Sequence, residues 1–259
     1  MNTNNDTYSL PAIVGVGASA GGLKALEAFL TAVPHSTDIA YVIIQHQMKD
    51  QSSMLGELLQ KKTDIKVENI KDGMTIEGNR IYISPPGKEI GIKKEMFTLE
   101  EPENKEGALH PIDSFFRVIA KKAERKAACV ILSGTGTDGT LGMKEINAHN
   151  GLCIAQNPQT ADYDGMPLSA IETGLVDYVL PPAEIPQSIV NYLSNYELDQ
   201  TIEDADLSSI EKIFNLLKTQ TGHDFSFYKK NTILRRINRR ISINDIKSEE
   251  EYVRYLKQN

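Results

Sequence analysis

A short apolar run that ends at a serine among glycines constrains this chain more than any other stretch. Residues 13–18 are apolar or glycine, and apolar residues recur at helical spacing from Leu23 onward. Residues 17–21 therefore read G-x-S-x-G, a tight strand-to-helix turn whose small residues allow backbone angles that a Cβ atom would resist. Such a turn places the Ser19 hydroxyl beside the electropositive start of a helix, where an oxyanion could be stabilised.

The same glycines also fit a looser dinucleotide-binding pattern, Gly15-x-Gly17-x-x-Ala20. That pattern requires an acidic residue at the end of the next strand, to hold the ribose hydroxyls. The next apolar run, residues 40–44, is instead followed by Gln45 and His46. A histidine suits a serine that needs a base, so we favour a hydrolase over a nucleotide-binding protein. A structural glycine turn with an incidental serine is the third interpretation.

The order of apolar runs along the chain predicts the fold. Residues 127–132 and 152–155 are continuous apolar runs of the kind that is buried on both faces of a parallel sheet. Helical patterns alternate with these runs, over residues 51–61, 111–125, 141–148, 169–173 and 183–193. This alternation predicts an α/β fold with a doubly wound, mostly parallel sheet. Four short runs between residues 66 and 99 predict antiparallel hairpins, attached to the sheet as an excursion from its parallel core.

Three polar side chains follow predicted strands: Ser19, His46 and Asp138, the last within the glycine-rich stretch 133–140. In such sheets, ligands bind beyond the carboxyl ends of the strands. A nucleophilic hydroxyl needs a base, and an imidazole base needs a carboxylate to fix its tautomer and stabilise the imidazolium. The spacing therefore favours a Ser-His-Asp triad. Alternatively, His46 bonds a backbone carbonyl and Asp138 caps the helix that follows it.

Composition narrows the class of protein. The two cysteines, Cys129 and Cys153, lie within apolar runs, which excludes a disulfide framework, and we expect no metal site. No apolar stretch has the length of a membrane-spanning helix, so we expect a cytoplasmic protein that is not embedded in a membrane. Residues 207–259 carry a net charge of +5, whereas residues 1–206 carry −12. The acidic residues 196–206 are expected to link domain 10–195 to a small all-α domain, 207–259.

Several separated motifs, in the same order, resemble the catalytic domain of the chemotaxis receptor methylesterase, CheB. They are residues 13–22, 44–46, 133–139, 155–157 and 165–167. The resemblance covers residues 10–193 and implies that Ser19, His46 and Asp138 form the family's catalytic triad. It implies hydrolysis of glutamyl γ-methyl esters on chemoreceptor cytoplasmic helices in chemotaxis adaptation, with deamidation of some receptor glutamines as a second activity. No cofactor is implied.

Three residues beside the expected triad depart from the family pattern. Ala20 replaces a usual threonine, while Gln47 and Thr135 replace usual methionines. With Gly136, these residues are expected to line the oxyanion or substrate site. Losing one oxyanion donor typically lowers turnover by about 10²–10³, but backbone N–H donors would survive these replacements. The family commonly has an amino-terminal receiver domain, which the residues before Leu10 do not supply, so we expect different regulation.

The basic tail resembles the small helical amino-terminal domain of the receptor methyltransferase, CheR, in residues 210–217, 221–229 and 234–240. Isoleucines 233, 237 and 241 and Leu234 share one side of a predicted helix. The other side carries four arginines, Arg235, Arg236, Arg239 and Arg240. The resemblance implies that they bind acidic receptor helices. A solvated face, RNA or anionic lipid is the alternative, and we expect no nucleic acid partner.

No glycine-rich methyl-donor motif follows the tail. We therefore expect a truncated piece of a CheB–CheR fusion that cannot methylate. For the whole chain, the alternative to an esterase is a catalytically weak scaffold that keeps the fold and docks receptors through its arginine helix.

Overall fold

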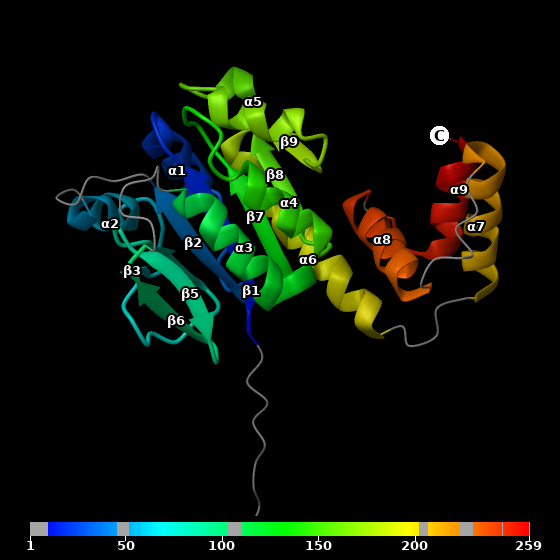
Figure 1. Cartoon of the computed structure of the whole chain (residues 1–259), viewed down its shortest axis with the longest axis horizontal. Helices are drawn as coiled ribbons and strands as arrows, with labels where there is room; N and C mark the ends of the chain where they lie inside the picture. Colours follow the sequence, from blue (N-terminus) through cyan, green and yellow to red (C-terminus); the bar gives the residue numbers. More distant parts are fainter. Residues whose placement is uncertain are drawn as a thin grey trace, which may run out of the picture. The chain divides into compact units, whose positions relative to one another are not determined.

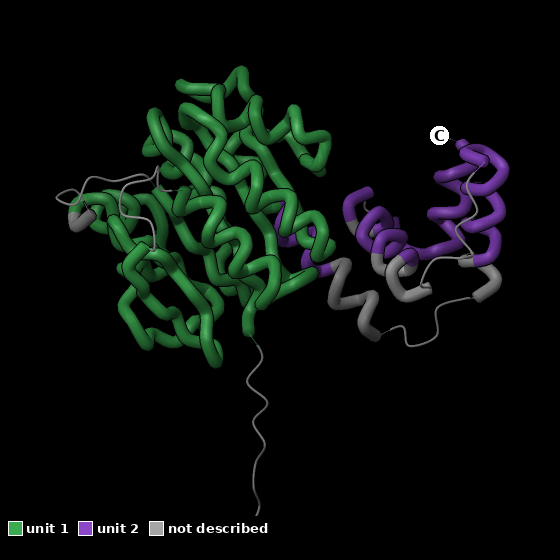
Figure 2. The backbone as a smooth tube through the Cα atoms, viewed as in Figure 1, with its two compact units in different colours: residues 1–187 green, residues 188–259 purple. Residues whose placement is uncertain are grey.

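The computed structural model describes residues 10–45, 52–102, 110–201, 207–222, 230–244 and 246–258. These residues fall into two compact units, which Figure 2 colours separately, with the division at residues 187 and 188. The first unit contains the predicted α/β sheet (Figure 1). The second contains the predicted small helical domain.

The main sheet has the strand order β3-β4-β2-β1-β7-β8-β9, and every neighbouring pair is parallel. This confirms the predicted doubly wound α/β fold. Strands β1, β2, β7 and β8 are buried along almost their whole length, as their apolar runs predict. The strands are β1 (Ala12–Ala18), β2 (Ile39–Gln45), β3 (Val67–Asn69), β4 (Arg80–Ile83), β7 (Ala127–Ile131), β8 (Leu152–Gln156) and β9 (Tyr178–Leu180).

The prediction that all four short runs between residues 66 and 99 form hairpins is wrong for two of them. Strands β3 and β4 belong to the parallel sheet, and β4 pairs with β2 through residues such as Ile81 and Ile83. Only β5 (Glu89–Lys93) and β6 (Met96–Glu100) form an antiparallel hairpin, which is a separate two-stranded sheet. A short strand can pair with a buried neighbour in either direction, so its length did not reveal its place.

One face of the sheet is covered by α3 (Pro111–Ala123), α4 (Thr140–Ala148), α5 (Gly165–Glu172) and the β5–β6 hairpin, which share one apolar core. Helix α3 packs directly on β1. A Cβ atom at Gly15 would lie 2.6 Å from Phe116 Cε1, and one at Gly17 would lie 2.6 Å from Ile112 Cγ2. Two glycines of the opening motif therefore permit a helix to approach the strand closely.

The remaining helices of the first unit are α1 (Gly22–Thr31) and α2 (Ser52–Gln60), with short 3₁₀ turns η1 (Glu124–Lys126), η2 (Pro158–Thr160) and η3 (Pro182–Glu184). Helix α5 begins four residues earlier than residue 169, where a helix was predicted. Helix α6 (Ile185–Thr201) continues beyond residue 193, its predicted end. Cys129 and Cys153 are buried, free and opposite each other on β7 and β8.

The second unit contains α7 (Leu207–Thr221), α8 (Lys230–Ile243) and α9 (Glu249–Gln258). Ile233, Ile237 and Ile241 are buried, as the helical pattern of α8 predicts. They share a core with Ile213, Ile246, Tyr252 and Val253. The side chain of Leu234 lies outside the described part of the chain. Among the helices that the structure describes, none combines the length and the apolar character that a membrane crossing requires.

Candidate active site

The candidate site lies where the central strands end. Strand β1 has β2 on one side and β7 on the other, with Ala18 opposite Gln45 and Gly17 opposite Ile131. Chain connections leave β1 and β7 in opposite directions along the sheet, which is where doubly wound folds bind their ligands. Ser19 directly follows β1, and the stretch that carries Asp138 follows β7. His46 follows β2 in sequence, but His46 and Gln47 lie outside the described residues.

Ser19 occupies the strand-to-helix turn that the sequence predicts. Its N–H donates to the Ser133 carbonyl over 2.9 Å, and its own carbonyl accepts the Gly22 N–H over 2.9 Å. Gly21, which precedes helix α1, has a φ of 69°. This left-handed conformation explains the glycine. The turn is therefore fixed both to the start of α1 and to the stretch after β7.

Gly134 lies directly against the serine. A Cβ atom at Gly134 would lie 2.9 Å from Ser19 Cβ and would overlap the sulfur of Met166. The Met166 N–H donates to the Gly134 carbonyl over 2.9 Å, so α5 is held against this glycine. Any side chain at residue 134 would have to displace both the candidate nucleophile and the side chain of Met166.

Ser133 is a buried residue, 1% exposed, and its hydroxyl links three loops. Its Oγ lies 2.9 Å from the Ala20 carbonyl and 3.2 Å from the Tyr163 carbonyl, and it accepts the Tyr163 N–H over 3.0 Å. A hydroxyl donates one hydrogen at a time, and the shorter distance favours the Ala20 carbonyl as its acceptor. The main-chain N–H of Ser133 donates to Gln156 Oε1 over 2.8 Å. Ser133 therefore holds the Ser19 turn against the loop before α5.

Asp138 is buried and binds the start of α3. The N–H groups of Ile112 and Asp113 donate to its two carboxylate oxygens over 3.2 and 3.0 Å. The sequence interpretation of Asp138 as a cap for the helix after it is therefore wrong in its partner. Asp138 caps the earlier helix, which is adjacent only in space. Capping leaves lone pairs on both oxygens, so it is compatible with a role in a triad.

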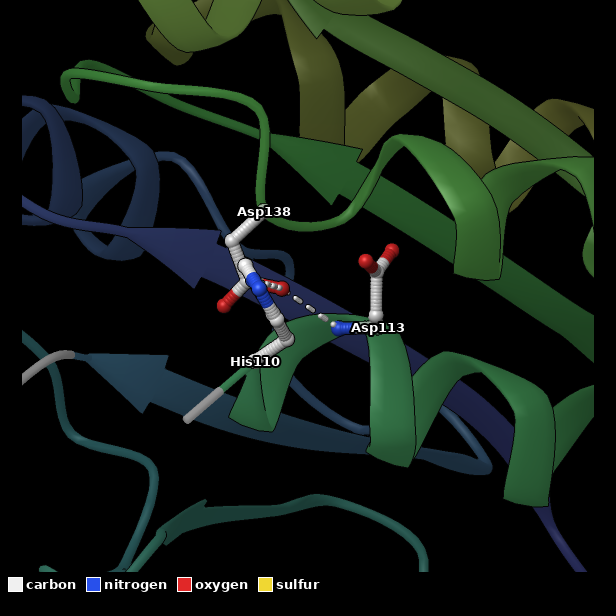
Figure 3. A group of neighbouring side chains, drawn as sticks. All are labelled: His110, Asp113 and Asp138. Carbon is white, nitrogen blue, oxygen red and sulfur yellow. Dashed lines mark hydrogen bonds and ion pairs between the residues drawn. The ribbon is translucent and has the colours of Figure 1, made fainter. Parts of the chain in front are cut away.

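Two further side chains lie beside Asp138 (Figure 3). His110 Nδ1 is 3.8 Å from Asp138 Oδ1, and the His110 side chain is 55% exposed. Asp113 is 4% exposed and accepts the Gly142 N–H over 2.7 Å. Within the described part of the chain, this is the one group of three potential metal ligands within 4.8 Å of one another. Since backbone N–H groups bind both carboxylates, we interpret the group as a pair of helix caps and assign it no ion.

The pKa of Asp113 is raised above its ordinary value, chiefly because the carboxyl group is buried. The negative charge of Asp138 raises it further. The Gly142 N–H and the nearby Arg117 lower it, but not enough to reverse the shift. A carboxyl group with a raised pKa thus lies beside the candidate catalytic carboxylate.

The other predicted site residues are placed as follows. The carbonyl of half-buried Ala20 accepts the Ser133 hydroxyl, as described. Thr135 and Gly136 are exposed in the turn before Asp138, and the Gly136 carbonyl accepts the Ser169 hydroxyl over 3.2 Å. In α8, Arg236 and Arg240 are exposed and Arg239 is half-buried. The side chain of Arg235 lies outside the described residues.

Sequence reasoning did not identify Ser133, Gly134, Tyr163, Met166 and Asp113 as parts of the site. Ser133 and Gly134 lie in the second glycine-rich stretch, from which the sequence pattern assigns only Thr135, Gly136 and Asp138 to the site. Asp113 carried a usable signal, because it lies between apolar residues of the predicted helix and is nonetheless acidic. A charged residue on a buried helix face needs a partner.

A parallel sheet whose strand connections reverse direction between β1 and β7, with a serine on the turn after β1, places this chain among the doubly wound α/β proteins. The model of the CheB methylesterase family matches residues 14–189. The chain therefore belongs to the CheB methylesterase family, a family of carboxylic ester hydrolases. The model of the CheR methyltransferase all-alpha domain matches residues 208–259.

Individual relatives agree with the family match. A protein of Geobacillus kaustophilus, named protein-glutamate methylesterase/protein-glutamine glutaminase, is 33% identical over 187 residues, which cover 70% of this chain and 54% of the relative. A Leptospira interrogans protein that bears the same name provisionally is 32% identical over 181 residues, covering 70% of this chain and 94% of the relative.

A solved structure supports the fold assignment. The crystal structure of the Thermotoga maritima CheB methylesterase catalytic domain superposes with a TM-score of 0.65 and 29% identity. The match covers 70% of this chain and 97% of that domain.

Proposed function

We propose that this chain hydrolyses glutamyl γ-methyl esters on the cytoplasmic helices of chemoreceptors, with deamidation of receptor glutamines as a second reaction. The observation that carries the proposal is the direct bond between two turns. The Ser19 N–H donates to the Ser133 carbonyl, which joins the nucleophile turn after β1 to the stretch that carries Asp138 after β7. The names of the relatives describe the same pair of reactions.

In the proposed mechanism, the Ser19 hydroxyl attacks the ester carbonyl while His46 takes its proton. The resulting imidazolium returns the proton to the departing methoxide, so methanol leaves and an acyl-enzyme forms. Water, deprotonated by His46, then releases the glutamate side chain and regenerates Ser19. Asp138 accepts a hydrogen bond from the imidazole of His46 and keeps it in the required tautomer.

The oxyanion donor in this mechanism must come from a residue other than Ser19, whose N–H already donates to the Ser133 carbonyl. We assign the N–H of Ala20, because the residue after the nucleophile supplies one donor in comparable turns. A backbone donor does not depend on the side chain, so alanine can replace the family's threonine at small cost. Gln47, Thr135 and Gly136 are assigned to the lining of the substrate site.

The two family matches support a division of labour along the chain, which we assign as follows. Residues 10–195 form the proposed catalytic domain, residues 196–206 link the domains, and residues 207–259 dock the receptor. Arginines 235, 236, 239 and 240 of α8 would bind acidic receptor helices, since guanidinium groups pair well with carboxylates.

The test is release of methanol from methyl-labelled receptor. Ser19→Ala should abolish release, and His46→Gln should reduce it by several orders of magnitude. Ser194→Ala is the matched control, because Ser194 is an exposed serine of α6. Loss in Ser19→Ala but not in the control supports the esterase. Receptor binding without release by the wild type, under every partner condition, supports the alternative of a receptor-docking scaffold.

A further inference from the structure

Helices α3 and α4 lack caps from their own N-cap side chains. The residues before their first turns are His110 and Gly139, and neither supplies a side-chain bond to its own helix in the region that the structure describes. The first N–H groups of a helix have no partner within it, and burying them unpaired is costly. Each helix start therefore needs an acceptor from elsewhere.

The two helices exchange acceptors. Asp138, two residues before α4, accepts the N–H groups of Ile112 and Asp113 at the start of α3. Asp113, in the first turn of α3, accepts the N–H of Gly142 in the first turn of α4 over 2.7 Å. Both aspartates are buried, with 4% of each residue exposed. Asp138, which precedes α4, thus caps α3, and Asp113, which belongs to α3, caps α4.

Close packing makes the exchange possible. A Cβ atom at Gly142 would lie 2.5 Å from Phe116 Cβ and 2.8 Å from the Asp113 carbonyl oxygen. The first turn of α4 therefore rests directly on α3. Because the two turns are in contact, the hydrogen bond from the Gly142 N–H to Asp113 fixes the start of α4. The start of α4 in turn fixes the preceding turn, which carries Asp138.

Repulsion between the two carboxyl groups opposes this arrangement, so the hydrogen bonds from the helix N–H groups are needed to stabilise it. Asp138 and Asp113 bring two carboxyl groups together in a buried place, which raises the pKa of Asp113. The other charged or titratable groups that face Asp113 and Asp138 among the described residues are Arg117 and His110. Two like charges at this spacing repel, and the positive ends of the two helices offset the repulsion.

We propose that Asp113 is a positioning residue for Asp138. Its bond to the Gly142 N–H holds the start of α4, and with it the turn that presents the Asp138 carboxylate, in register with the start of α3. This proposal rests on the proposed function, because it assigns Asp113 an effect on the triad carboxylate.

The test compares Asp113→Ala and Asp113→Asn by kcat and KM for methanol release, with rates normalised to folded protein measured by circular dichroism. Asp113→Ala removes the acceptor and should lower kcat by about 10–10², as for a misplacement of about 1 Å, with KM little changed. Asp113→Asn keeps an oxygen that accepts the Gly142 N–H, so its kcat should lie closer to that of the wild type.

Asp177→Ala is the matched control. Asp177 precedes β9, at the opposite end of the parallel strands, and also accepts a backbone N–H, that of Cys153, over 2.9 Å. Its loss removes the same kind of bond from the same domain far from the proposed triad. This variant should lose stability while keeping kcat.

A double-mutant comparison separates positioning from folding. If Asp113 acts through Asp138, Asp113→Ala should lower the residual rate of Asp138→Asn very little. An equal loss in both backgrounds would overturn the positioning role, as would equal losses of kcat in Asp113→Ala and Asp177→Ala. If Asp113→Ala alone keeps its kcat while Ser19→Ala and Asp138→Asn lose theirs, only the positioning role fails. If those two variants keep wild-type turnover, the proposed triad itself fails.

Discussion

The nucleophile turn and the carboxylate turn follow neighbouring strands, β1 and β7, but different forces hold them in place. Ser19 is held by a bond between main-chain groups and by van der Waals contact with Gly134, which leaves no room for a side chain. Asp138 is held by charge, because its carboxylate accepts two N–H groups at the start of α3. The comparison indicates that main-chain bonding and close packing govern the position of Ser19, whereas a charged side chain governs that of Asp138.

Replacing Asp138 should have the strongest effect on the rate, because the position of the carboxylate turn depends on charge. Asp138→Asn nearly keeps the volume and removes the charge, and it should lower kcat by about 10³–10⁴ by analogy with other triads. Circular dichroism should show a folded protein. A substitution that changed the volume of residue 138 but kept its negative charge should lower kcat less. An unchanged kcat would reduce Asp138 to a cap for α3.

The turn that carries Ser19 should be sensitive to one added methyl group, measured as a loss of kcat. Gly134→Ala places a Cβ atom 2.9 Å from Ser19 Cβ, so it should displace the nucleophile and lower kcat by about 10². Gly56→Ala is the matched control, because the nearest atoms to a Cβ in that part of α2 lie at 3.6 and 3.8 Å. It should leave the rate unchanged. Equal rates for Gly134→Ala and the wild type would contradict the steric account of Ser19.

The close packing of α4 against α3 should contribute measurably to the free energy of unfolding. Gly142→Ala inserts a methyl group between α4 and α3, which should lower the free energy of unfolding by about 1–3 kcal/mol. Urea unfolding, again with Gly56→Ala for comparison, measures the effect. No loss of stability would show that the two helices can separate freely.

A smaller loss of stability is expected when the Ser133 hydroxyl, which joins the loops around Ser19, is removed. Ser133→Ala removes the donor to the Ala20 carbonyl and the acceptor of the Tyr163 N–H. It should cost about 1 kcal/mol of unfolding free energy and less than about tenfold in kcat. A loss of kcat as large as that of Asp138→Asn would show that Ser133 does more than join loops.

The smallest effect is a dependence of stability on pH. Because the pKa of Asp113 is higher in the folded protein than its ordinary value, ionisation of this group costs folding free energy. The contribution of Asp113 is therefore fully present below the unfolded pKa of about 3.9 and is lost as the pH rises through the folded pKa. Relative to Asp113→Asn, the wild type should lose stability over that range in urea unfolding. A constant difference would contradict the shift.

Local sequence patterns were enough to predict several parts of this protein. Continuous apolar runs require burial on both faces, so the parallel sheet could be predicted from β1, β7 and β8. The glycines around Ser19 determined the strand-to-helix turn, because small residues are needed there. The isoleucines at every fourth position of α8 determined which side of that helix is buried.

The contacts between segments that are distant in sequence depend on three-dimensional packing. It placed β3 and β4 in the sheet, because a short strand pairs with whichever neighbour the chain brings alongside it. It also made Asp138 the cap of α3 and Asp113 the cap of α4, an exchange between residues 25 apart or more. Helix propensity and capping patterns act within a few residues, whereas these bonds arise from the packing of two helices side by side. No local pattern specifies such packing.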